Sequence, residues 1–252
     1  MRTDDVTVAC QTLFQSGALT LGLTTPAARK PGQYADVATE LAVARRADRY
    51  GFAALWASQP PWPLATANFT DDGQAAFDDP FVWLAALGAV APRAALVVQA
   101  DWFRYDRAQL LNAARSLQRM TNGRCALGFA GADDGYISRL VEQAALQAAP
   151  GIPVLHLDGD GQRHPVMREL TLDVDDSASA PAALTGQVWR GGRIALAVEL
   201  ERLAEAGVAH VLLHLVRNGR PTLDVIDELG TEVIPRLAAM VSARCGYAGE
   251  AR

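Results

Sequence analysis

Two histidines have the sequence context of acid–base residues. His156 and His214 each lie between two leucines inside a short apolar segment. Because side chains alternate between the two faces of a strand, each histidine lies on the face opposite its leucines. An imidazole on the inner face of a barrel can give or take a proton near neutral pH. We therefore name His156 and His214 as candidate catalytic residues, with a purely structural histidine as the alternative.

A segment rich in aromatic residues is the second candidate for chemistry. It reads Gln99-Ala-Asp-Trp-Phe-Arg-Tyr105 and places an acidic and a basic group beside two large rings. Such a mixture suits the binding of a flat ring system. The alternative is that Trp102 and Phe103 only cap the rim of the fold. The candidate cofactor-binding residues here are Gln99, Ala100, Asp101 and Trp102.

Two further positions are candidates for contact with a cofactor. Gly131 follows an apolar strand, and Arg193 follows two glycines at the start of a predicted helix. The amino terminus of a helix favours anions, so Arg193 could meet a negatively charged group there. The alternative is that these glycines only supply flexible backbone. The two carboxylates after Gly131, Asp133 and Asp134, would repel a phosphate.

Other reactive side chains lack a pattern that indicates chemistry. His156, Asp158, Asp160 and His164 lie in a segment of turn composition without recognisable metal-ligand spacing, so we predict no metal site. Cys125 lies inside a predicted buried strand, where a thiol is normally inert. The serines have no nucleophile-elbow context.

The elements that must position these residues follow one rhythm. Short apolar strands alternate with amphipathic helices, which is the pattern of a parallel sheet with crossover helices. The chain therefore predicts an α/β fold, a TIM-type (β/α)8-like barrel forming one domain over residues 1–252. The predicted strands span residues 19–23, 52–56, 94–99, 125–129, 152–157, 168–174 and 208–215. The predicted helices span 34–50, a segment opened by Pro80, 107–120, 135–148, 194–206 and 222–240.

One interval departs from this rhythm. The strands that begin at Ile152 and Arg168 are too close together for a parallel crossover, which needs about a dozen connecting residues or more. They either form a hairpin or flank a position where a strand–helix unit is missing. We therefore expect an incomplete or irregular barrel between the fifth and seventh strand positions. The long loop over residues 58–79 is a candidate lid or binding loop.

Composition excludes several functional classes. The chain has 252 residues, half of them apolar, and a net charge of -5. This weak acidity argues against nucleic acid or an anionic membrane as a partner. No apolar run reaches the roughly 18 to 20 residues that span a bilayer, and the first residues do not resemble a secretion signal. The three cysteines are far apart, so we predict a cytoplasmic protein with reduced thiols.

Several segments, in order along the chain, resemble the luciferase-like monooxygenase family. Gly51–Trp56 reads GFAALW after an alanine-rich helix, and Asp79–Leu84 reads DPFVWL. Leu117–Gly131 reads LQRMTNGRCALGFAG and resembles the most recognisable stretch of the family. Gly191–Arg193 and Leu203–Val208 resemble its closing units. Together the similar segments cover about two-thirds of the chain.

The resemblance implies a flavin-dependent enzyme. Family members are (β/α)8 barrels that bind reduced FMN, or a deazaflavin in some branches, at the carboxyl ends of their strands. They oxygenate small organic substrates or transfer hydride to or from them, usually as dimers. This chain departs from the family over residues 131–186, which are shortened where relatives carry much of the grip on the flavin phosphate. It also has no glycine-rich phosphate loop.

Three functions follow as hypotheses. The first is a flavin-dependent oxidoreductase or monooxygenase acting on a small molecule, as a homodimer or paired with a full-length relative. The second is a non-catalytic protein on a degenerate barrel that binds a flavin, another ligand or a partner. Its motive is the missing phosphate-gripping region and the short interval between the strands that begin at Ile152 and Arg168. The third is a barrel with an unrelated small-molecule site, because a fold does not determine a function.

Overall fold

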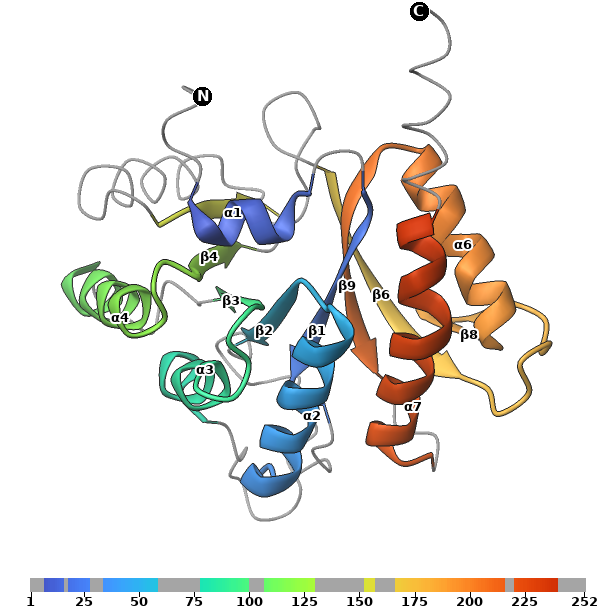
Figure 1. The fold of residues 1–252 in the computed structure, drawn as a ribbon, viewed down its shortest axis with the longest axis horizontal. Coiled ribbons are helices and arrows are strands. Elements are labelled where there is room, and N and C mark those ends of the chain that lie inside the picture. The colour runs from blue at the N-terminus through green and yellow to red at the C-terminus, as the bar shows by residue number, and fades with distance from the viewer. Residues whose placement is uncertain are drawn as a thin grey trace, which may run out of the picture.

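A single mixed sheet, flanked by helices, forms the body of the protein (Figure 1). The computed structural model describes residues 7–15, 18–27, 34–58, 78–99, 107–129, 152–156, 166–215 and 220–239. The strands are β1 (Thr20–Thr25), β2 (Ala54–Ser58), β3 (Ala95–Gln99), β4 (Cys125–Phe129), β5 (Val154–His156), β6 (Val166–Val174), β7 (Ala183–Thr185), β8 (Val188–Gly191) and β9 (Val208–Leu215). The helices are α1 (Val8–Leu13), α2 (Val37–Tyr50), α3 (Pro80–Gly88), α4 (Arg107–Met120), α6 (Arg193–Glu205), α7 (Thr222–Glu228) and the π-helical turn η2 (Leu229–Val233).

The strand order is that of a TIM-type barrel with an irregular sector. Neighbouring strands follow the order β5-β4-β3-β2-β1-β9-β6-β8-β7. All neighbouring pairs are parallel except β7 with β8. The last long strand therefore returns beside the first, as barrel closure requires. Among the described residues, β5 and β7 are the two edges of the sheet, so the sheet is open between these two strands.

The hairpin alternative for residues 152–174 is wrong. Strand β5 pairs with β4, whereas β6 pairs with β9 along Val166–Leu172 and with β8 along Thr171–Val174. The short interval thus marks the irregular sector itself. The short strands β7 and β8, which we did not predict, add to the sheet beyond β6. Their residues lie in a polar segment without an apolar strand pattern.

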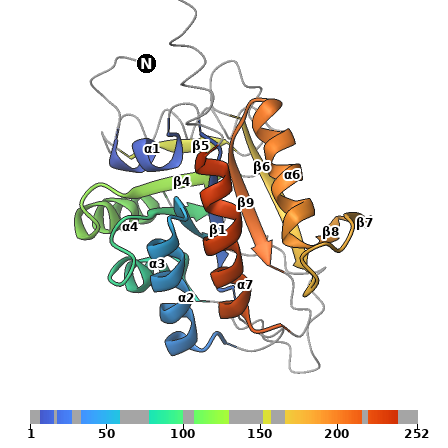
Figure 2. The same cartoon turned by 45° about the vertical axis from the view of Figure 1, so that its right-hand side comes forward.

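Two separate apolar clusters cover the two faces of the sheet. On the outer face, alternate strand residues such as Leu23, Leu55 and Leu96 pack against the helices. On the inner face, Trp56, Val97 and Leu212 belong to a second cluster that contains no residue of α2, α3 or α4. Side chains alternate between these faces because the period of a strand is two residues. Helix α7 covers the outer face of the sheet between α2 and α6 (Figure 2).

Helix α1 lies across the end of the sheet at which the parallel strands begin (Figure 1). Its residues Ala9 and Leu13 are fully buried in the inner cluster. The backbone N–H of Ala9 donates to the carbonyl of Gly123, just before β4, at 3.3 Å. We did not predict this helix, because six residues are too few to show a helical period. It closes the amino-terminal end of the barrel and leaves chemistry to the opposite end.

Local residue chemistry determines several helix ends, although α2 begins at Val37 and not at the predicted residue 34. Gly51 ends α2 in the left-handed conformation, with φ of 90°. Asp36 accepts a hydrogen bond from the Thr39 N–H at the start of the same helix. Pro80 is in the first turn of α3, as predicted. No helix among the described residues is long and apolar enough to cross a membrane.

A buried guanidinium joins the loops at the closed end. Arg124 is 8 % exposed and donates to four carbonyl oxygens, those of Gly88, Ala91, Ala94 and Thr121, at 2.6 to 3.0 Å. Burial lowers the pKa of Arg124 from its ordinary value, and the carboxylate of Asp48 opposes that shift. The loop before β3 is thereby tied to the loop before β4.

The substitution Arg124→Leu should destabilise the fold because it leaves these carbonyls without donors. We expect a loss of about 2–4 kcal/mol in the free energy of unfolding, measured by urea denaturation. Arg202→Gln is the control, since Arg202 pairs with Glu199 on the exposed face of α6 and should change stability by less than about 1 kcal/mol. Equal effects of both substitutions would contradict this role.

Candidate functional site

Polar side chains gather on the inner face near the carboxyl ends of β1, β6 and β9. In β9, Leu212 lies in the inner cluster, so His210 and His214 share its face. In β6, Glu169 is the register partner of Leu212 and shares that face as well. Because parallel strands end together, these groups lie where the loops of a barrel build active sites.

His214 is held between a hydroxyl and a carboxylate. Its Nδ1 lies 3.0 Å from Thr24 Oγ1. Its Nε2 lies 3.3 Å from Glu169 Oε2, which is an ion-pair distance but does not meet hydrogen-bond geometry. The Nε2 atom is buried, although the side chains of His214 and Glu169 are 29 % and 42 % exposed. The imidazole thus has a hydroxyl contact at Nδ1 and a carboxylate at ion-pair distance from Nε2.

A second polar pair lies at the ends of β2 and β3. The Ser58 hydroxyl donates to Gln99 Oε1 at 2.5 Å, and the two residues are register partners. This bond uses one oxygen of the Gln99 amide, whereas its NH2 group adds two donors. Both side chains are only partly buried. Neutral donors and acceptors of this kind are suited to the heteroatoms of a flat, uncharged ring.

Trp56 forms the floor beneath these groups. Its indole is fully buried and stacks on the His210 imidazole, with ring centroids 6.0 Å apart and an interplanar angle of 26°. Glycines make room for it: a Cβ at Gly128 would lie 2.6 Å from Trp56 Cζ3, and one at Gly22 would lie 2.9 Å from Trp56 Nε1. The floor therefore seals the polar groups from the closed end.

His210 belongs to this floor and not to the reactive groups. It is fully buried, and its Nδ1 lies 2.8 Å from Thr20 Oγ1. Burial lowers the pKa of His210 to about 3, so the ring is neutral at physiological pH. A neutral, enclosed imidazole cannot exchange a proton with a ligand above Trp56. Its Nε2 and Trp56 Nε1 both lack a hydrogen-bond partner among the described residues.

The structure describes some of the predicted site residues and not others. His214 and Gln99 both lie at the carboxyl end of the inner face. His156 lies in β5 as the register partner of Phe129, but its side chain is outside the description. Ala100, Asp101, Trp102 and Gly131 lie outside the described residues.

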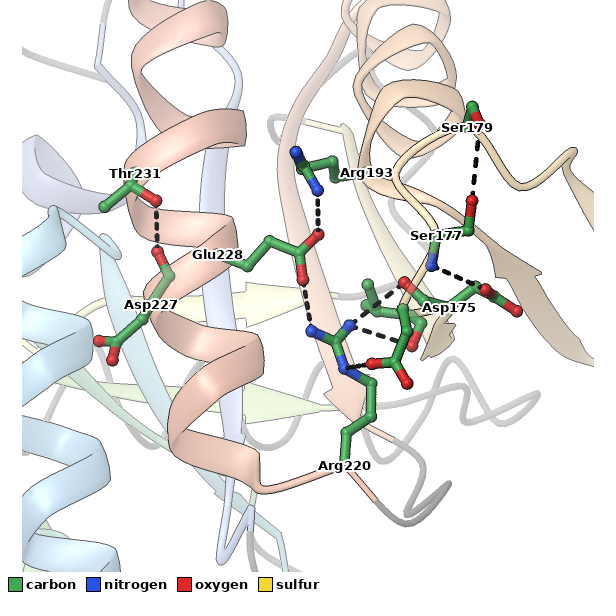
Figure 3. A network of polar contacts seen from close by, with 10 residues as sticks. Asp175, Ser177, Ser179, Arg193, Arg220, Asp227, Glu228 and Thr231 are labelled. Carbon is green, nitrogen blue, oxygen red and sulfur yellow. Dashed lines mark hydrogen bonds and ion pairs between the residues drawn. The ribbon is translucent and has the colours of Figure 1, made fainter.

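Arg193 lies in a network that joins α6 to α7 (Figure 3). Its Nη1 is 3.0 Å from Glu228 Oε1, and Arg220 Nη2 is 2.6 Å from the other oxygen of Glu228. Arg220 also donates to the Val174 carbonyl at the end of β6, at 3.3 Å. The network thus connects α7 to the end of β6, and its Glu228 carboxylate engages the guanidinium of Arg193.

The amino terminus of α6 is closed by backbone. The N–H groups of Gly192 and Ile194 donate to the carbonyls of Ala180 and Ala178, at 3.0 and 3.2 Å. A Cβ at Gly192 would overlap with the carbonyl of Ser177. The glycines of this segment thus serve close packing, whereas the alternative that we gave for them was flexible backbone.

Sequence reasoning did not single out Glu169. Two features indicate Glu169: side chains alternate between the faces of β6, and β6 pairs with β9. Together they bring Glu169 beside His214. The hydroxyl of Thr24 follows from the same logic, since β1 also pairs with β9. No group of three or more His, Cys, Asp and Glu side chains among the described residues could hold a metal ion.

Comparison with solved structures identifies the class of fold. An F420-dependent secondary alcohol dehydrogenase in complex with an F420–acetone adduct matches with a TM-score of 0.62 and 13 % identity over 86 % of this chain and 98 % of that chain. The coenzyme F420-dependent tetrahydromethanopterin reductase from Methanopyrus kandleri matches with a TM-score of 0.62 and 10 % identity over 87 % and 99 %. A riboflavin lyase with modified FMN and riboflavin matches with a TM-score of 0.61 and 10 % identity over 88 % and 92 %.

The protein therefore has the TIM-type fold of luciferase-like flavin and F420 enzymes, and the resemblance seen in the sequence holds at the level of the fold. No family model matches the sequence, and no curated protein matches it.

The described inner face fits the ring of a flavin or deazaflavin. The buried Nε2 of His214 lacks a hydrogen-bond partner there, and Ser58 and Gln99 offer neutral polar groups. The charged residues on this face of β6, Glu169 and Asp173, are acidic, and Asp173 lies 3.6 Å from Arg190. The described inner face thus suits an uncharged ring better than a phosphate.

The fit between Trp56 and Gly128 can be tested by a double-mutant cycle. Gly128→Ala should cost about 1–3 kcal/mol of unfolding free energy, because the new methyl group overlaps with the indole. In a Trp56→Phe background the smaller ring leaves space, so the same substitution should cost clearly less. Additive effects in thermal or urea unfolding would show that the indole does not lie over Gly128.

His210 should make stability depend on pH. Because folding depresses the pKa of His210, the unfolded chain binds a proton more readily below about pH 6.5. The contribution of the neutral His210 ring to the free energy of unfolding is complete above that pH. It is lost as the pH falls toward 3, at up to about 1.4 kcal/mol per pH unit. Unfolding free energies of the wild type and His210→Gln between pH 7 and 4.5 check this. The variant should show the smaller decrease, and equal slopes would contradict the assignment.

Proposed function

We propose that this protein is a flavin- or deazaflavin-dependent oxidoreductase or monooxygenase that acts on a small organic substrate. The observation that carries the proposal is His214, whose imidazole has Thr24 Oγ1 3.0 Å from Nδ1 and Glu169 Oε2 3.3 Å from Nε2. A histidine placed between a hydroxyl and a carboxylate is suited to proton transfer. It lies at the carboxyl ends of the strands, where barrel enzymes carry their active sites.

The similar structures support the choice of cofactor. One of them contains an F420–acetone adduct and another contains modified FMN. Both contain flat tricyclic rings, which a protein must orient and shield from competing reactions. The Trp56 floor and the neutral Ser58–Gln99 pair supply that shielding and orientation here. The predicted residues Ala100, Asp101 and Trp102, which follow Gln99 in the sequence, belong to the same proposed ring site, as does Gly131. Arg193, whose guanidinium pairs with Glu228, we assign instead to the network between α6 and α7.

In this proposal each group of residues has its own task. The bound flavin supplies hydride transfer or oxygen activation. His214 holds or moves a proton at Nε2, with Thr24 fixing its other nitrogen. Gln99 orients the ring through its amide, and its oxygen is already engaged by the Ser58 hydroxyl. Trp56 and His210 exclude water from below. His156 remains a second candidate for proton transfer.

The second candidate is a non-catalytic protein that binds a ligand or a partner. It is favoured by the open sheet, because β5 and β7 are edges among the described residues. In that case the ring site could persist without turnover. In either case we propose an assembly, a homodimer or a pair with a full-length relative, which analytical ultracentrifugation would detect.

Titration with FMN and with F420, oxidised and reduced, tests the first function. A cofactor present at a hundred times its dissociation constant should stabilise the folded protein by about 2.7 kcal/mol, seen as a shift in Tm. If turnover is found, His214→Gln should lower kcat by about 10²- to 10⁴-fold, as expected for loss of an acid–base group. Arg236→Gln, which removes an exposed ion pair with Glu201, is the control.

Two results would overturn the proposal. Absence of binding with all four cofactor forms would favour the second candidate. Cofactor binding with an unchanged rate in His214→Gln would retain the oxidoreductase but remove His214 from its chemistry.

A further inference from the structure

Strands β1 and β9 carry the same contact twice. Thr20 meets His210 and Thr24 meets His214, in each case through the threonine Oγ1 and the imidazole Nδ1, at 2.8 and 3.0 Å. The two contacts lie four residues apart on the same pair of parallel strands. Their surroundings differ, because His210 is fully buried and the side chain of His214 is 29 % exposed.

At the buried end, the hydroxyl determines which ring nitrogen of His210 carries the proton. Thr20 Oγ1 lies 2.5 Å from the Leu13 carbonyl and 3.2 Å from the Ala209 carbonyl. Carbonyl oxygens only accept, so the single hydroxyl proton of Thr20 is directed to one of them. The imidazole must then donate to Thr20, which places the proton of the neutral ring on Nδ1.

At the open end, the same reasoning gives the opposite result. Glu169 Oε2 lies 3.3 Å from His214 Nε2, at ion-pair distance but without hydrogen-bond geometry. A carboxylate oxygen accepts, so the relay inferred below requires an imidazole proton on Nε2, facing Glu169. Nδ1 then offers a lone pair and accepts from the Thr24 hydroxyl. The relay therefore requires opposite tautomers for the two histidines of β9.

This tautomer leaves Thr24 able to accept a proton from a ligand. Because its hydroxyl donates to His214, the lone pairs of its oxygen are available to a hydrogen-bond donor on the inner face. We propose that Thr24, His214 and Glu169 form a proton relay between the ligand site and solvent, and that it serves a substrate with a hydroxyl or N–H group. This inference rests on the oxidoreductase function proposed above and extends it to the substrate class.

The proton path balances with the cofactor chemistry. In oxidation, the substrate hydroxyl or N–H proton moves to Thr24 Oγ1, the Thr24 proton moves to His214 Nδ1, and the Nε2 proton moves to Glu169. The two electrons and the hydrogen of the adjacent C–H leave as hydride to the oxidised flavin or deazaflavin, and a C=O or C=N bond forms. Glu169, whose side chain is 42 % exposed, then releases the proton to water. Reduction runs the same steps backwards.

The tautomers can be measured without any cofactor. In ¹⁵N-histidine-labelled protein near pH 7.5, long-range ¹H–¹⁵N spectra should show a protonated Nδ1 for His210 and a protonated Nε2 for His214. Thr24→Val should weaken the Nε2–H preference of His214, whereas Thr24→Ser should retain it. His210 should be unchanged in both variants and serves as the internal control. A protonated Nδ1 on His214 in the wild type would overturn the relay.

Kinetics with the holoenzyme test the relay in catalysis. Thr24→Val and Glu169→Gln should each lower kcat by about tenfold or more and reduce the solvent isotope effect, with Thr24→Ser restoring most of the rate. Thr231→Val, which removes an exposed hydroxyl of η2 that donates to the Asp227 carbonyl, is the control. A wild-type rate in Thr24→Val would refute the relay and leave the oxidoreductase intact. Absence of cofactor binding by the wild type would refute the proposed function, while the tautomer measurement would still decide the direction of the hydrogen bonds.

Discussion

The indole of Trp56 is the constraint on which the inside of this barrel depends. It stacks on His210 and lies against the backbone of both Gly22 and Gly128, so strands β1, β2, β4 and β9 meet around one ring. A side chain at either glycine would displace it. Because protein interiors are packed as densely as organic crystals, the ring also determines where the dry floor ends and a ligand site can begin.

Along β1 and β9 one structural motif serves two purposes. Near α1, the Thr20–His210 contact is enclosed, and the imidazole is a neutral packing element. Four residues further on, Thr24 and His214 repeat the contact beside a carboxylate and partly exposed to solvent. The change from structure to chemistry therefore comes from solvation and from Glu169. Residue type alone does not distinguish the two histidines.

The packing of α6 and α7 beside β6 shows how polar residues can serve stability instead. Arg193 and Arg220 share the two oxygens of Glu228, and Arg220 also bonds the end of β6. This network holds α7 to the strand that carries Glu169. Beyond β6, the short strands β8 and β7 extend the sheet in the sector where strands β5 and β7 form its edges. The short strands of the irregular sector thus still support β6, the strand that carries Glu169.

The sequence by itself determined the order of the main elements. The spacing of apolar residues indicates each helix and strand, and Gly51 and Pro80 mark helix ends through local backbone conformation. It also indicated a barrel with an irregular sector and the carboxyl-end position of His214 and Gln99. It did not indicate α1, β7 or β8, which are too short or too polar to carry a period. Only the tertiary structure decided that Glu169 and Thr24 meet His214 and that Glu228 meets Arg193, because these contacts depend on strand register and helix packing between residues far apart in the chain.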